Sequence, residues 1–361
     1  MKRYYFIVGE ASGDLHAANL IKELSRLDKY AKFQGFGGER MRKEGLKLTK
    51  HYQEMAFMGF WEVFTNLSAI RRNFKQAKKE LLEYKPDVLV LVDYPGFNMR
   101  MATFAKKHNI KVVYYITPQV WAWKASRVKK LKRDLDLLLP ILPFERSFFA
   151  KHDIDVNYVG HPLLDAFKDL DSRNIESEKP IIAILPGSRK QEIATSLPIM
   201  MEVAKSFENY QFIIAGAPSI SQDYYRSITQ DSYMPVLSNQ THALLKECKA
   251  AIVTSGTATL EAAILKVPQV VCYKTSSISY LVAKLVVKVK YIALVNLICD
   301  KEVVKELIQD DFNADNLVSE LNRILNKKNK TQILSDYESM IRLLGDVGAS
   351  KRAAEAIISL N

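Results

Sequence analysis

Short apolar runs alternate with longer amphipathic stretches through the first half of the chain. Each run is bounded by turn-forming residues and is rich in β-branched or aromatic side chains, as buried parallel strands are. The runs that predict strands are residues 4–8, 32–36, 88–92, 111–116, 135–139 and 156–159. Helical periodicity fills residues 15–27, 62–84, 99–107, 125–133 and 146–152. This alternation predicts βαβ units and therefore a mainly parallel sheet.

The same alternation begins again after a polar segment. Residues 169–180 end in a proline and are typical of a linker. Beyond it, the expected strands are residues 181–185, 212–215, 251–254 and 269–273, and the expected helices are residues 195–207, 243–248, 257–265 and 279–289. The tail from residue 301 is expected to be helical throughout. We therefore predict an α/β protein with two Rossmann-like parallel-sheet domains, residues 1–168 and 180–340, that face a cleft.

Composition narrows the class of protein. The 361 residues suggest two domains, and 25% charged with 48% apolar residues is a globular composition. The net charge of +12 favours an anionic partner (nucleic acid, an acidic membrane face or a phosphorylated substrate), and an ordinary basic enzyme fits it as well. The three cysteines match no metal or disulfide pattern, so we expect reduced thiols in a cytosolic protein. We expect no signal peptide and no membrane crossing, because lysines interrupt the most apolar stretch, residues 276–299.

The stretch V-G-E-A-S-G-D-L-H follows the first expected strand. The strand should break at Gly9, and a helix should begin near Asp14. This places a candidate site at the carboxyl end of a strand, where open α/β sheets bind ligands. The stretch is acidic, which does not suit a phosphate.

Two further loops in the first half carry polar or aromatic residues. In D-Y-P-G-F-N, Asp93 could be a general base, because a partly buried carboxylate can have its pKa raised toward neutrality, or it could form a turn. Asn98 in the same loop is a possible N-cap. In P-Q-V-W-A-W, Gln119 could bond hydroxyl groups. The indoles of Trp121 and Trp123 could cover a sugar face or an acyl chain, or they could be core residues.

Two loops in the second half suit an anion. In L-P-G-S-R-K-Q-E-I, Gly187 permits close backbone approach and Arg189 offers a fork for a diphosphate, although a plain loop with a surface arginine would look the same. In T-S-G-T-A-T-L-E, small hydroxyl residues and a glycine open a helix, and the N–H groups of a helix start bind anions. Glu261, one turn after Thr257, could accept both hydroxyls of a ribose or could be an ordinary first-turn acid.

Other features are less specific. The chain lacks the dinucleotide fingerprint and the P-loop motif. His161 is more often a structural than a catalytic histidine in such a position. Basic helical faces near the apolar residues 57–61 could be solvated or could bind anionic lipid. These faces hold Arg71, Arg72, Lys75, Lys78, Lys79, Lys129, Lys130, Lys132 and Arg133.

Taken in order, the motifs resemble those of the lipid-A-disaccharide synthase family. They are G-E-A-S-G-D (9–14), D-Y-P-G-F-N (93–98), P-Q-V-W-A-W (118–123), G-H-P (160–162), L-P-G-S-R-x-x-E-I (185–193), T-S-G-T-A-T-L-E (254–261) and G-A-S-x-R-A-A (348–354). Each motif alone is weak, but the ordered set covers nearly the whole chain and is specific.

The resemblance implies a GT-B glycosyltransferase of lipid A biosynthesis, peripheral on the cytosolic face of the Gram-negative inner membrane. It implies an inverting transfer that joins UDP-2,3-diacylglucosamine to 2,3-diacylglucosamine 1-phosphate by a β(1→6) bond and releases UDP. By GT-B analogy, the helix at residues 341–361 packs back on the first domain. No metal or other cofactor is expected, because Arg189 and helix-end amides can stabilise the leaving diphosphate. The implied partners are the UDP-sugar donor, the acylated glucosamine phosphate acceptor and anionic lipid, with no nucleic acid and a possible homodimer.

The resemblance also assigns roles to residues. Asp93 is the candidate base, with Glu10 and Asp14 as alternatives that would otherwise bond acceptor hydroxyls. The residues expected to hold UDP are Gly187, Ser188, Arg189, Ser255, Gly256, Thr257, Glu261 and Asn296. The residues expected to bind the acceptor are Ser12, Gly13, Asn98, Gln119 and Trp121. Many relatives have proline where Val295 stands here, which is a departure next to Asn296.

Two alternative hypotheses accompany this one. Another GT-B enzyme on UDP-N-acetylglucosamine, such as a non-hydrolysing 2-epimerase, would share the nucleotide site but would need no lipid acceptor. A non-catalytic nucleic-acid-binding protein would need basic and aromatic residues interleaved along one groove. The basic residues here lie mainly in amphipathic helices, away from the glycine loops.

Overall fold

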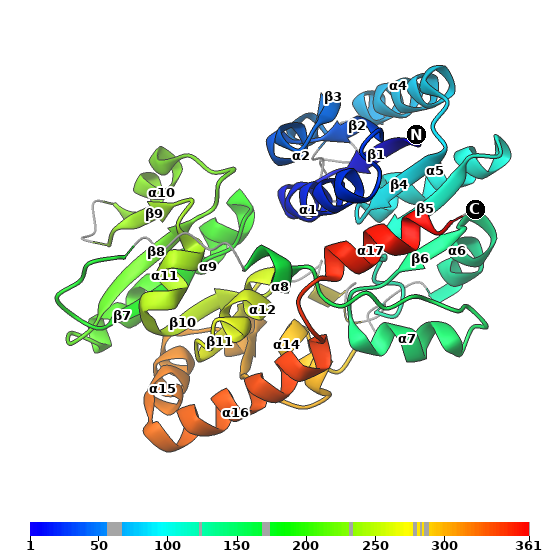
Figure 1. The fold of residues 1–361 in the computed structure, drawn as a ribbon. Coiled ribbons are helices and arrows are strands. Elements are labelled where there is room, and N and C mark those ends of the chain that lie inside the picture. Colours follow the sequence, from blue (N-terminus) through cyan, green and yellow to red (C-terminus); the bar gives the residue numbers. More distant parts are fainter. Residues whose placement is uncertain are drawn as a thin grey trace. The chain divides into compact units, whose positions relative to one another are not determined.

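The computed structural model of this chain describes residues 1–55, 67–122, 125–167, 174–230, 234–276, 280–281, 284 and 289–360. The chain forms two compact units (Figure 1). Unit 1 consists of Met1–Lys168 together with Leu344–Asn361, and unit 2 consists of Asp169–Leu343. Each unit contains one six-stranded sheet in which every strand pairing is parallel.

The sheet of unit 1 has the strand order β3-β2-β1-β4-β5-β6. Its strands are β1 (Arg3–Val8), β2 (Lys32–Gly37), β3 (Leu46–His51), β4 (Val88–Val92), β5 (Lys111–Tyr115) and β6 (Leu137–Leu139). Its helices are α1 (Ala11–Leu27), α2 (Glu39–Lys43), α4 (Leu67–Tyr84), α5 (Pro95–Lys107), α6 (Val128–Asp134), α7 (Pro143–Ala150), α8 (Leu163–Ala166) and α17 (Ala349–Ile358). The two central strands, β1 and β4, end together, because Val8 pairs with Val92.

Alternate side chains of β1 belong to two different hydrophobic clusters. Tyr4, Phe6 and Val8 pack with residues of α1 and α17, whereas Tyr5 and Ile7 pack with residues of α4 and α5. All five side chains are fully buried. Strands covered by helices on both faces read as continuous apolar runs, which is why the strand positions were visible in the sequence.

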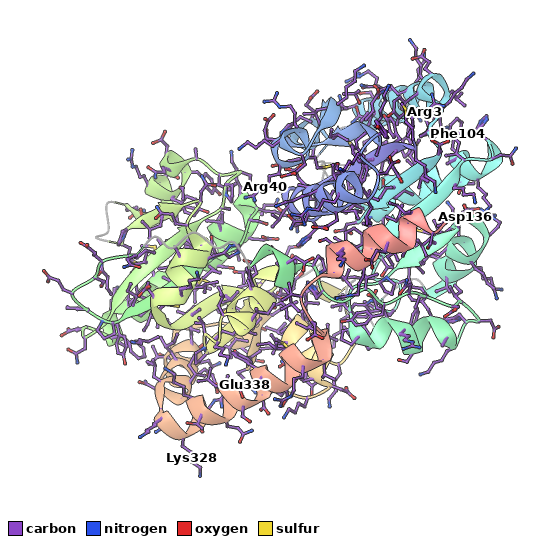
Figure 2. All side chains as sticks on the ribbon, viewed as in Figure 1. Arg3, Arg40, Phe104, Asp136, Lys328 and Glu338 are labelled. Atoms are coloured by element: carbon purple, nitrogen blue, oxygen red, sulfur yellow. The ribbon has the colours of Figure 1, made fainter. Side chains whose placement is uncertain are left out.

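The sheet of unit 2 has the strand order β12-β11-β10-β7-β8-β9. Its strands are β7 (Ile181–Leu185), β8 (Gln211–Gly216), β9 (Val236–Ser238), β10 (Cys248–Thr254), β11 (Gln269–Tyr273) and β12 (Glu306–Ile308). Its helices are α9 (Lys190–Val203), α10 (Gln222–Thr229), α11 (Thr241–Glu247), α12 (Thr257–Ile264), α14 (Leu294–Cys299) and α15 (Ala314–Leu325), and α16 (Lys327–Leu344) leads out of the unit. Lys328 and Glu338 project from the exposed side of α16 (Figure 2).

Several expected elements differ from the observed ones. The strand expected at residues 156–159 is wrong, because the chain there is irregular. The expectation of a wholly helical tail is also wrong, because β12 lies within it. β3 and β9 were not expected, since their exposed positions weaken the apolar pattern. Of the helix expected at residues 62–84, residues 62–66 lie outside the described residues, as do part of the helix expected at 279–289 and part of the linker.

The closing motif G-A-S-x-R-A-A packs against the chain that contains G-H-P. The carboxylate of Asp165 accepts hydrogen bonds from the backbone N–H groups of Gly348 and Ser350, the latter at 2.7 Å, and so caps α17. The Arg352 guanidinium donates from Nε to the carbonyl oxygen of Val159 at 2.8 Å. Gly160 has a φ of +86°, and a Cβ added there would lie 2.6 Å from Nη2 of Arg352. The two motifs therefore form one clamp that holds α17 in unit 1.

Replacing Gly160 with alanine should destabilise unit 1. The substitution forces a Cβ into left-handed backbone and against Arg352, which we expect to cost about 1–3 kcal/mol of unfolding free energy. Urea unfolding would measure the loss. Gly96→Ala is the matched control, because no atom lies within 4 Å of a Cβ added there. Equal unfolding midpoints for the two variants would contradict the clamp.

Candidate functional site

The strand order reverses at the centre of each sheet. The reversal lies between β1 and β4 in unit 1 and between β7 and β10 in unit 2. At such a switch point, the loops that follow neighbouring strands run to opposite faces, and open α/β sheets bind ligands there. The four loops concerned are residues 9–10, 93–94, 186–189 and 255–256. All four lie in motifs that the sequence marked as candidate sites.

Asp93 lies in a tightly held turn at the end of β4. Asp93 and Tyr94 both adopt left-handed backbone, with φ of 45° and 48°. Non-glycine residues hold this conformation only when their surroundings enforce it. The carbonyl oxygen of Asp93 accepts hydrogen bonds from the Tyr114 hydroxyl at 2.6 Å and from Nδ2 of Asn98 at 2.8 Å. These bonds fix the direction in which the Asp93 carboxyl leaves the strand.

Asn98 is buried and acts within the fold. Its Nδ2 donates to the carbonyl oxygens of Ile7 at 3.3 Å, Val92 at 3.1 Å and Asp93 at 2.8 Å. The expected N-cap role is wrong, because α5 begins at Pro95 and its N-cap is Tyr94. The expected contact of Asn98 with the acceptor is corrected too, because Asn98 is fully buried and its amide nitrogen joins the ends of β1 and β4.

The surroundings of Asp93 raise the pKa of its carboxyl group toward neutrality. Burial, followed by the negative charge of Glu10, raises the pKa of Asp93 to about 7, against a hydrogen bond from the backbone of Tyr94. Asp93 and Glu10 are both partly exposed, so water and ligands can reach them. Bases work best when their pKa lies near the operating pH.

The acidic motif after β1 divides between two roles. The helix begins at Ala11 rather than near Asp14, so Ser12, Gly13 and Asp14 lie in its first turn and Glu10 is the N-cap. Asp14 is buried and accepts from the backbone N–H of Arg40 at 3.1 Å and of Met41 at 3.2 Å. It therefore caps α2, and we no longer regard it as a candidate base. Arg40 is labelled in Figure 2.

The glycines of this motif allow close packing. A Cβ added to Gly9 would lie 2.3 Å from the ring of Tyr94, and one added to Gly13 would lie 2.8 Å from Val8. Neither site tolerates a side chain without movement of its neighbour. Gly13, which we expected to bind the acceptor, is buried, whereas Ser12 is partly exposed.

A buried glutamate holds the loop after β5. Oε1 of Glu145 accepts hydrogen bonds from the Thr117 hydroxyl and from Nε1 of Trp121, the latter at 3.3 Å. Oε2 accepts from the backbone N–H groups of Ile141 and Leu142. Burial raises the pKa of Glu145 to about 7, although these four hydrogen bonds oppose the rise. Gln119, between the two anchored residues, is exposed.

Sequence reasoning did not find Glu145. The available signal was its place at the third position of a helix that opens with proline, where a glutamate often completes a capping box. Its contacts with Thr117 and Trp121 could not be read from spacing. Trp123, the second indole of that motif, lies outside the described residues.

His161 is a structural histidine. It is buried, and burial followed by the neighbouring His16 lowers its pKa to about 3. Its Nδ1 accepts from the backbone N–H of Leu163 at 3.2 Å. The imidazole is therefore neutral near pH 7, which agrees with the structural role that we considered more common.

In unit 2, the loop after β7 is organised by Glu192. Gly187 has a φ of +113°, and Glu192 lies where its Cβ would be. Oε2 of Glu192 accepts from the Ser188 N–H at 3.1 Å, and Oε1 lies 3.0 Å from Nη1 of the exposed Arg189. Tyr273, at the end of β11, lies close to both charges: burial and then Glu192 raise its pKa, and Arg189 lowers it. Arg189 is thus an exposed guanidinium at the sheet edge, beside Glu192 and Tyr273.

The loop after β10 opens α12 as the sequence predicted. Ser255 is fixed by its N–H, which donates to Cys272 O at 2.9 Å, and by its hydroxyl, which donates to Ile292 O at 3.2 Å. Gly256 and Thr257 are exposed at the start of the helix. Because the Ser255 hydroxyl proton is engaged, Thr257 is the better hydroxyl donor to an anion at this helix start. Glu261 is partly exposed one turn later and bonds His242, a partner that the sequence did not reveal.

The UDP-binding role expected for Asn296 is wrong in this structure. It is fully buried, and all of its amide groups are satisfied within the chain. Nδ2 donates to Val304 O and to Oε1 of Glu306, each at 2.8 Å, and Oδ1 accepts from the N–H groups of Val303 and Val304. Its side chain therefore has no capacity left for UDP. It fastens α14 to the chain that leads into β12.

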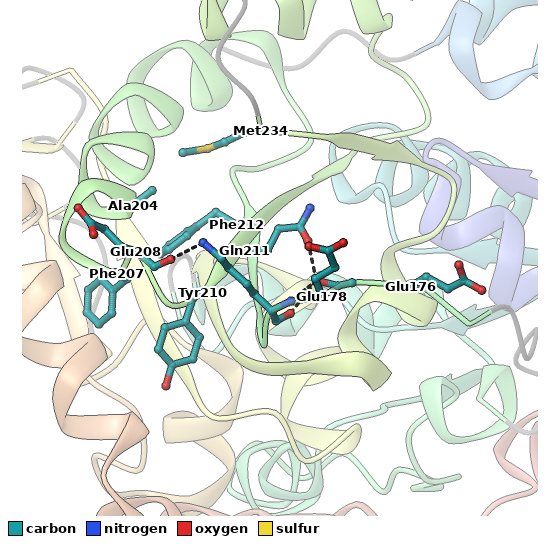
Figure 3. A pocket seen from close by; sticks show the side chains of 11 residues that line it. Glu176, Glu178, Ala204, Phe207, Glu208, Tyr210, Gln211, Phe212 and Met234 are labelled. Atoms are coloured by element: carbon teal, nitrogen blue, oxygen red, sulfur yellow. Dashed lines mark hydrogen bonds between the residues drawn. The ribbon is translucent and has the colours of Figure 1, made fainter.

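One surface hollow lies away from these loops. It measures about 870 Å³ and is bordered by residues that precede β7 and by the start of β8 (Figure 3). Glu178, Phe207 and Tyr210 are among its lining residues. It therefore sits at the amino ends of the strands, opposite the edge that carries the candidate site, and none of the candidate residues line it.

Two features are absent from the part of the chain that the structure describes. No helix there is both long and apolar enough to cross a bilayer. His, Cys, Asp and Glu residues there form no group of three or more that could hold a metal ion. The apolar residues 57–61 and most of residues 277–288 fall outside that part.

Comparison with solved structures identifies the class of the fold. An UDP-GlcNAc 2-epimerase from Neisseria meningitidis bound to UDP-GlcNAc aligns with a TM-score of 0.66 at 15% identity, over 99% of each chain. The S. aureus MnaA–UDP structure aligns with a TM-score of 0.70 at 13% identity, over 99% of this chain and 96% of that one. The glycotransferase of kitacinnamycin aligns with a TM-score of 0.67 at 13% identity, over 99% of each chain. The fold is thus of the GT-B type.

Sequence comparison identifies the family. The family model described as lipid-A-disaccharide synthetase matches residues 4–359. The lipid-A-disaccharide synthases of Trichlorobacter lovleyi and Geobacter sulfurreducens are each 36% identical over 99% of this chain and 97% of their own length. That of Coxiella burnetii is 34% identical over 99% of this chain and 98% of its own. The chain belongs to the lipid-A-disaccharide synthase family, a family of glycosyltransferases, which confirms the resemblance seen in the motifs.

The family assignment also decides between the alternatives. The epimerases share the fold at 13–15% identity, which carries no information about reaction. The synthases are similar over almost the whole chain at more than twice that identity. The epimerase and nucleic-acid hypotheses are therefore set aside.

Asn296→Ala tests the corrected role of that residue. It leaves the buried N–H groups of Val303 and Val304 without an acceptor and should cost about 2–4 kcal/mol of unfolding free energy. Urea unfolding would measure it, with the exposed Asn322→Ala on α15 as control. A loss no greater than that of the control would contradict the structural role.

Proposed function

We propose that this chain transfers the acylated glucosamine of UDP-2,3-diacylglucosamine to the 6-hydroxyl of 2,3-diacylglucosamine 1-phosphate, with release of UDP. Unit 1 would hold the acceptor and unit 2 the donor. The observation that carries the proposal is that the motif loops lie at the switch points of both sheets. One loop holds Asp93, whose pKa is raised to about 7, and another opens α12 with exposed residues.

Asp93 would be the base of the reaction. A single in-line displacement inverts the α-linked donor to a β product and requires the proton of the acceptor hydroxyl to be removed as the bond forms. An ionised Asp93 carboxylate takes this proton, and its raised pKa lets it hold the proton near pH 7. Glu10 would act beside it, as a charge that keeps the pKa of Asp93 high.

The residues of unit 2 would stabilise the leaving UDP. Negative charge grows on the β-phosphate as the sugar departs. The N–H groups at the start of α12, the Thr257 hydroxyl and the Arg189 guanidinium are donors that could meet this charge without rearrangement. Glu261 would bind the ribose. Trp121 and the exposed Gln119 would contribute to acceptor binding in unit 1.

Membrane contact would come from unit 1. α4 carries five exposed basic side chains, namely Arg71, Arg72, Lys75, Lys78 and Lys79. Each basic residue close to an anionic bilayer contributes about 1 kcal/mol of attraction. The acylated substrates reside in such a bilayer, so we propose a peripheral location on the inner membrane.

We also propose a homodimer, which analytical sedimentation can test.

Acceptor-dependent UDP release tests the reaction and the base together. Release from UDP-2,3-diacylglucosamine should require the monosaccharide 1-phosphate, and Asp93→Asn should lower kcat by at least about 100-fold, since base catalysis is worth 10²–10⁴. For the wild type, kcat/KM should rise with pH through about 7, because only the ionised Asp93 accepts a proton.

Glu10→Gln should move this rise to lower pH, because it removes a negative charge that raises the pKa of Asp93. Glu83→Gln, an exposed charge-matched control on α4, should leave the profile unchanged. Full turnover by the Asp93→Asn variant would show that another group is the base. Interconversion of UDP-N-acetylglucosamine with its epimer, in place of transfer, would overturn the proposed function.

Charge reversal on α4 tests membrane contact. Lys75→Glu with Lys78→Glu should weaken binding to vesicles of phosphatidylglycerol and phosphatidylcholine by at least about 10-fold in a flotation assay, and added salt should reduce the difference. Lys327→Glu with Lys328→Glu on α16 changes the net charge equally. Equal loss in both double variants would show a net-charge effect and argue against docking through α4.

A further inference from the structure

Glu261 forms a hydrogen bond with a residue outside its motif, which the motif did not predict. Nε2 of His242 lies 2.9 Å from Oε2 of Glu261. The side chain of His242 is 30% exposed and that of Glu261 is 18% exposed. The pair is therefore shielded, but a ligand can still reach it. His242 is the second residue of α11, whereas Glu261 is the fifth residue of α12. The pair therefore joins the two helices that precede and follow β10.

The pair lies at the ligand-binding edge of the unit 2 sheet. α11 begins three residues after Ser238, where β9 reaches its carboxyl end. α12 begins three residues after Thr254, the carboxyl end of β10. Parallel strands place both helix starts at one edge, and that edge carries the switch point. His242 thus reaches Glu261 from a neighbouring element at the site itself.

We propose that His242 is a positioning residue for the ribose of the bound nucleotide. It donates from Nε2 to Oε2 of Glu261 and holds the carboxylate in one orientation. A carboxylate offers about four lone-pair sites, so Oε1 and the remaining site on Oε2 can accept the 2′- and 3′-hydroxyls of UDP. This inference rests on the proposed function, since it assumes that Glu261 meets the ribose of UDP.

The benefit of such a contact is preorganisation. A glutamate side chain is among the most flexible, and a ligand that must order it loses affinity. A hydrogen bond already present in the free protein removes that loss. Removal of His242 should therefore weaken the binding of UDP by about fivefold to tenfold. It should leave the affinity for a nucleotide that does not contact Glu261 unchanged.

The test compares two nucleotides on a set of variants. Calorimetric titration measures Kd for UDP and for 2′,3′-dideoxy-UDP with the wild type, His242→Leu and His242→Gln. Leucine removes the hydrogen-bond donor. Glutamine retains a donor, because its Nε2 can occupy a position similar to that of the imidazole Nε2. Glu247→Gln, exposed on the same helix, is the control, and thermal unfolding checks that each variant is folded.

We expect His242→Leu to raise Kd for UDP about fivefold to tenfold and to leave Kd for the dideoxy nucleotide within about twofold of wild type. His242→Gln should recover most of the loss. Equal weakening of both nucleotides would show that His242 supports the fold of the site and not the ribose contact. No weakening of UDP would show that Glu261 needs no orienting partner. Either result overturns the inference while UDP binding stands.

The wild type separates this failure from that of the proposed function. Wild-type protein that binds both nucleotides equally would remove the ribose role of Glu261 and the inference with it, but would keep the nucleotide site. Wild-type protein that binds neither nucleotide would overturn the inference and the UDP-dependent function together.

Discussion

One buried amide holds the carboxyl ends of the two central strands of unit 1. Asn98 donates to carbonyl oxygens at the ends of β1 and β4 and to that of Asp93. The left-handed backbone of Asp93 and Tyr94 depends on such bonds, because it is unfavourable without them. The orientation of the Asp93 carboxyl and the packing of Tyr94 on Gly9 follow from the same constraint. The proposed base is thus held in place by a buried amide whose nitrogen is bonded within the fold.

Unit 2 uses the same solution. Asn296 saturates its amide between α14 and the chain before β12, and Glu306 adds hydrogen bonds from the N–H groups of Ile292 and Ala293. This segment lies against the loop after β10, since the Ser255 hydroxyl donates to Ile292 O. A buried asparagine that fills all of its bonds is rigid, which suits a support for loops that must meet a ligand. Asn98, in the D-Y-P-G-F-N motif, and Asn296, outside the quoted motifs, are both buried and donate hydrogen bonds to backbone carbonyl groups.

The sequence predicted the sheets better than the helix starts. Strands such as Val88–Val92 are buried on both faces, so their apolar runs are unmistakable. The starts at Pro95 and Pro143 were placed too late, because proline was taken as part of a loop although it suits the first turn of a helix. β12 was missed because only three residues form it.

The sequence placed the candidate loops at strand ends, where the structure also has them, but it did not reveal the contacts of individual side chains. Asn98 and Asn296 were assigned to ligands, because a polar residue at a strand end looks the same whether it bonds a substrate or a carbonyl group. Glu145 and His242 were overlooked, because their partners lie on other elements and no local period links them. Contacts between side chains that are distant in the chain are set by packing, which a single sequence does not display.

The place of α17 affects the order in which the chain can fold during synthesis. Ala353, Ala354 and Ile357 complete the same cluster as Tyr4 and Phe6, and Nζ of Lys2 donates to the carbonyl oxygens of Ile358 and Leu360. The packing of β1 is therefore completed only when α17, which follows unit 2 in the chain, has been made. Unit 2 is contiguous and can close its core earlier. Unit 1 can thus be completed only after unit 2 has been synthesised, and the apolar face of α1 that packs on α17 stays uncovered until then.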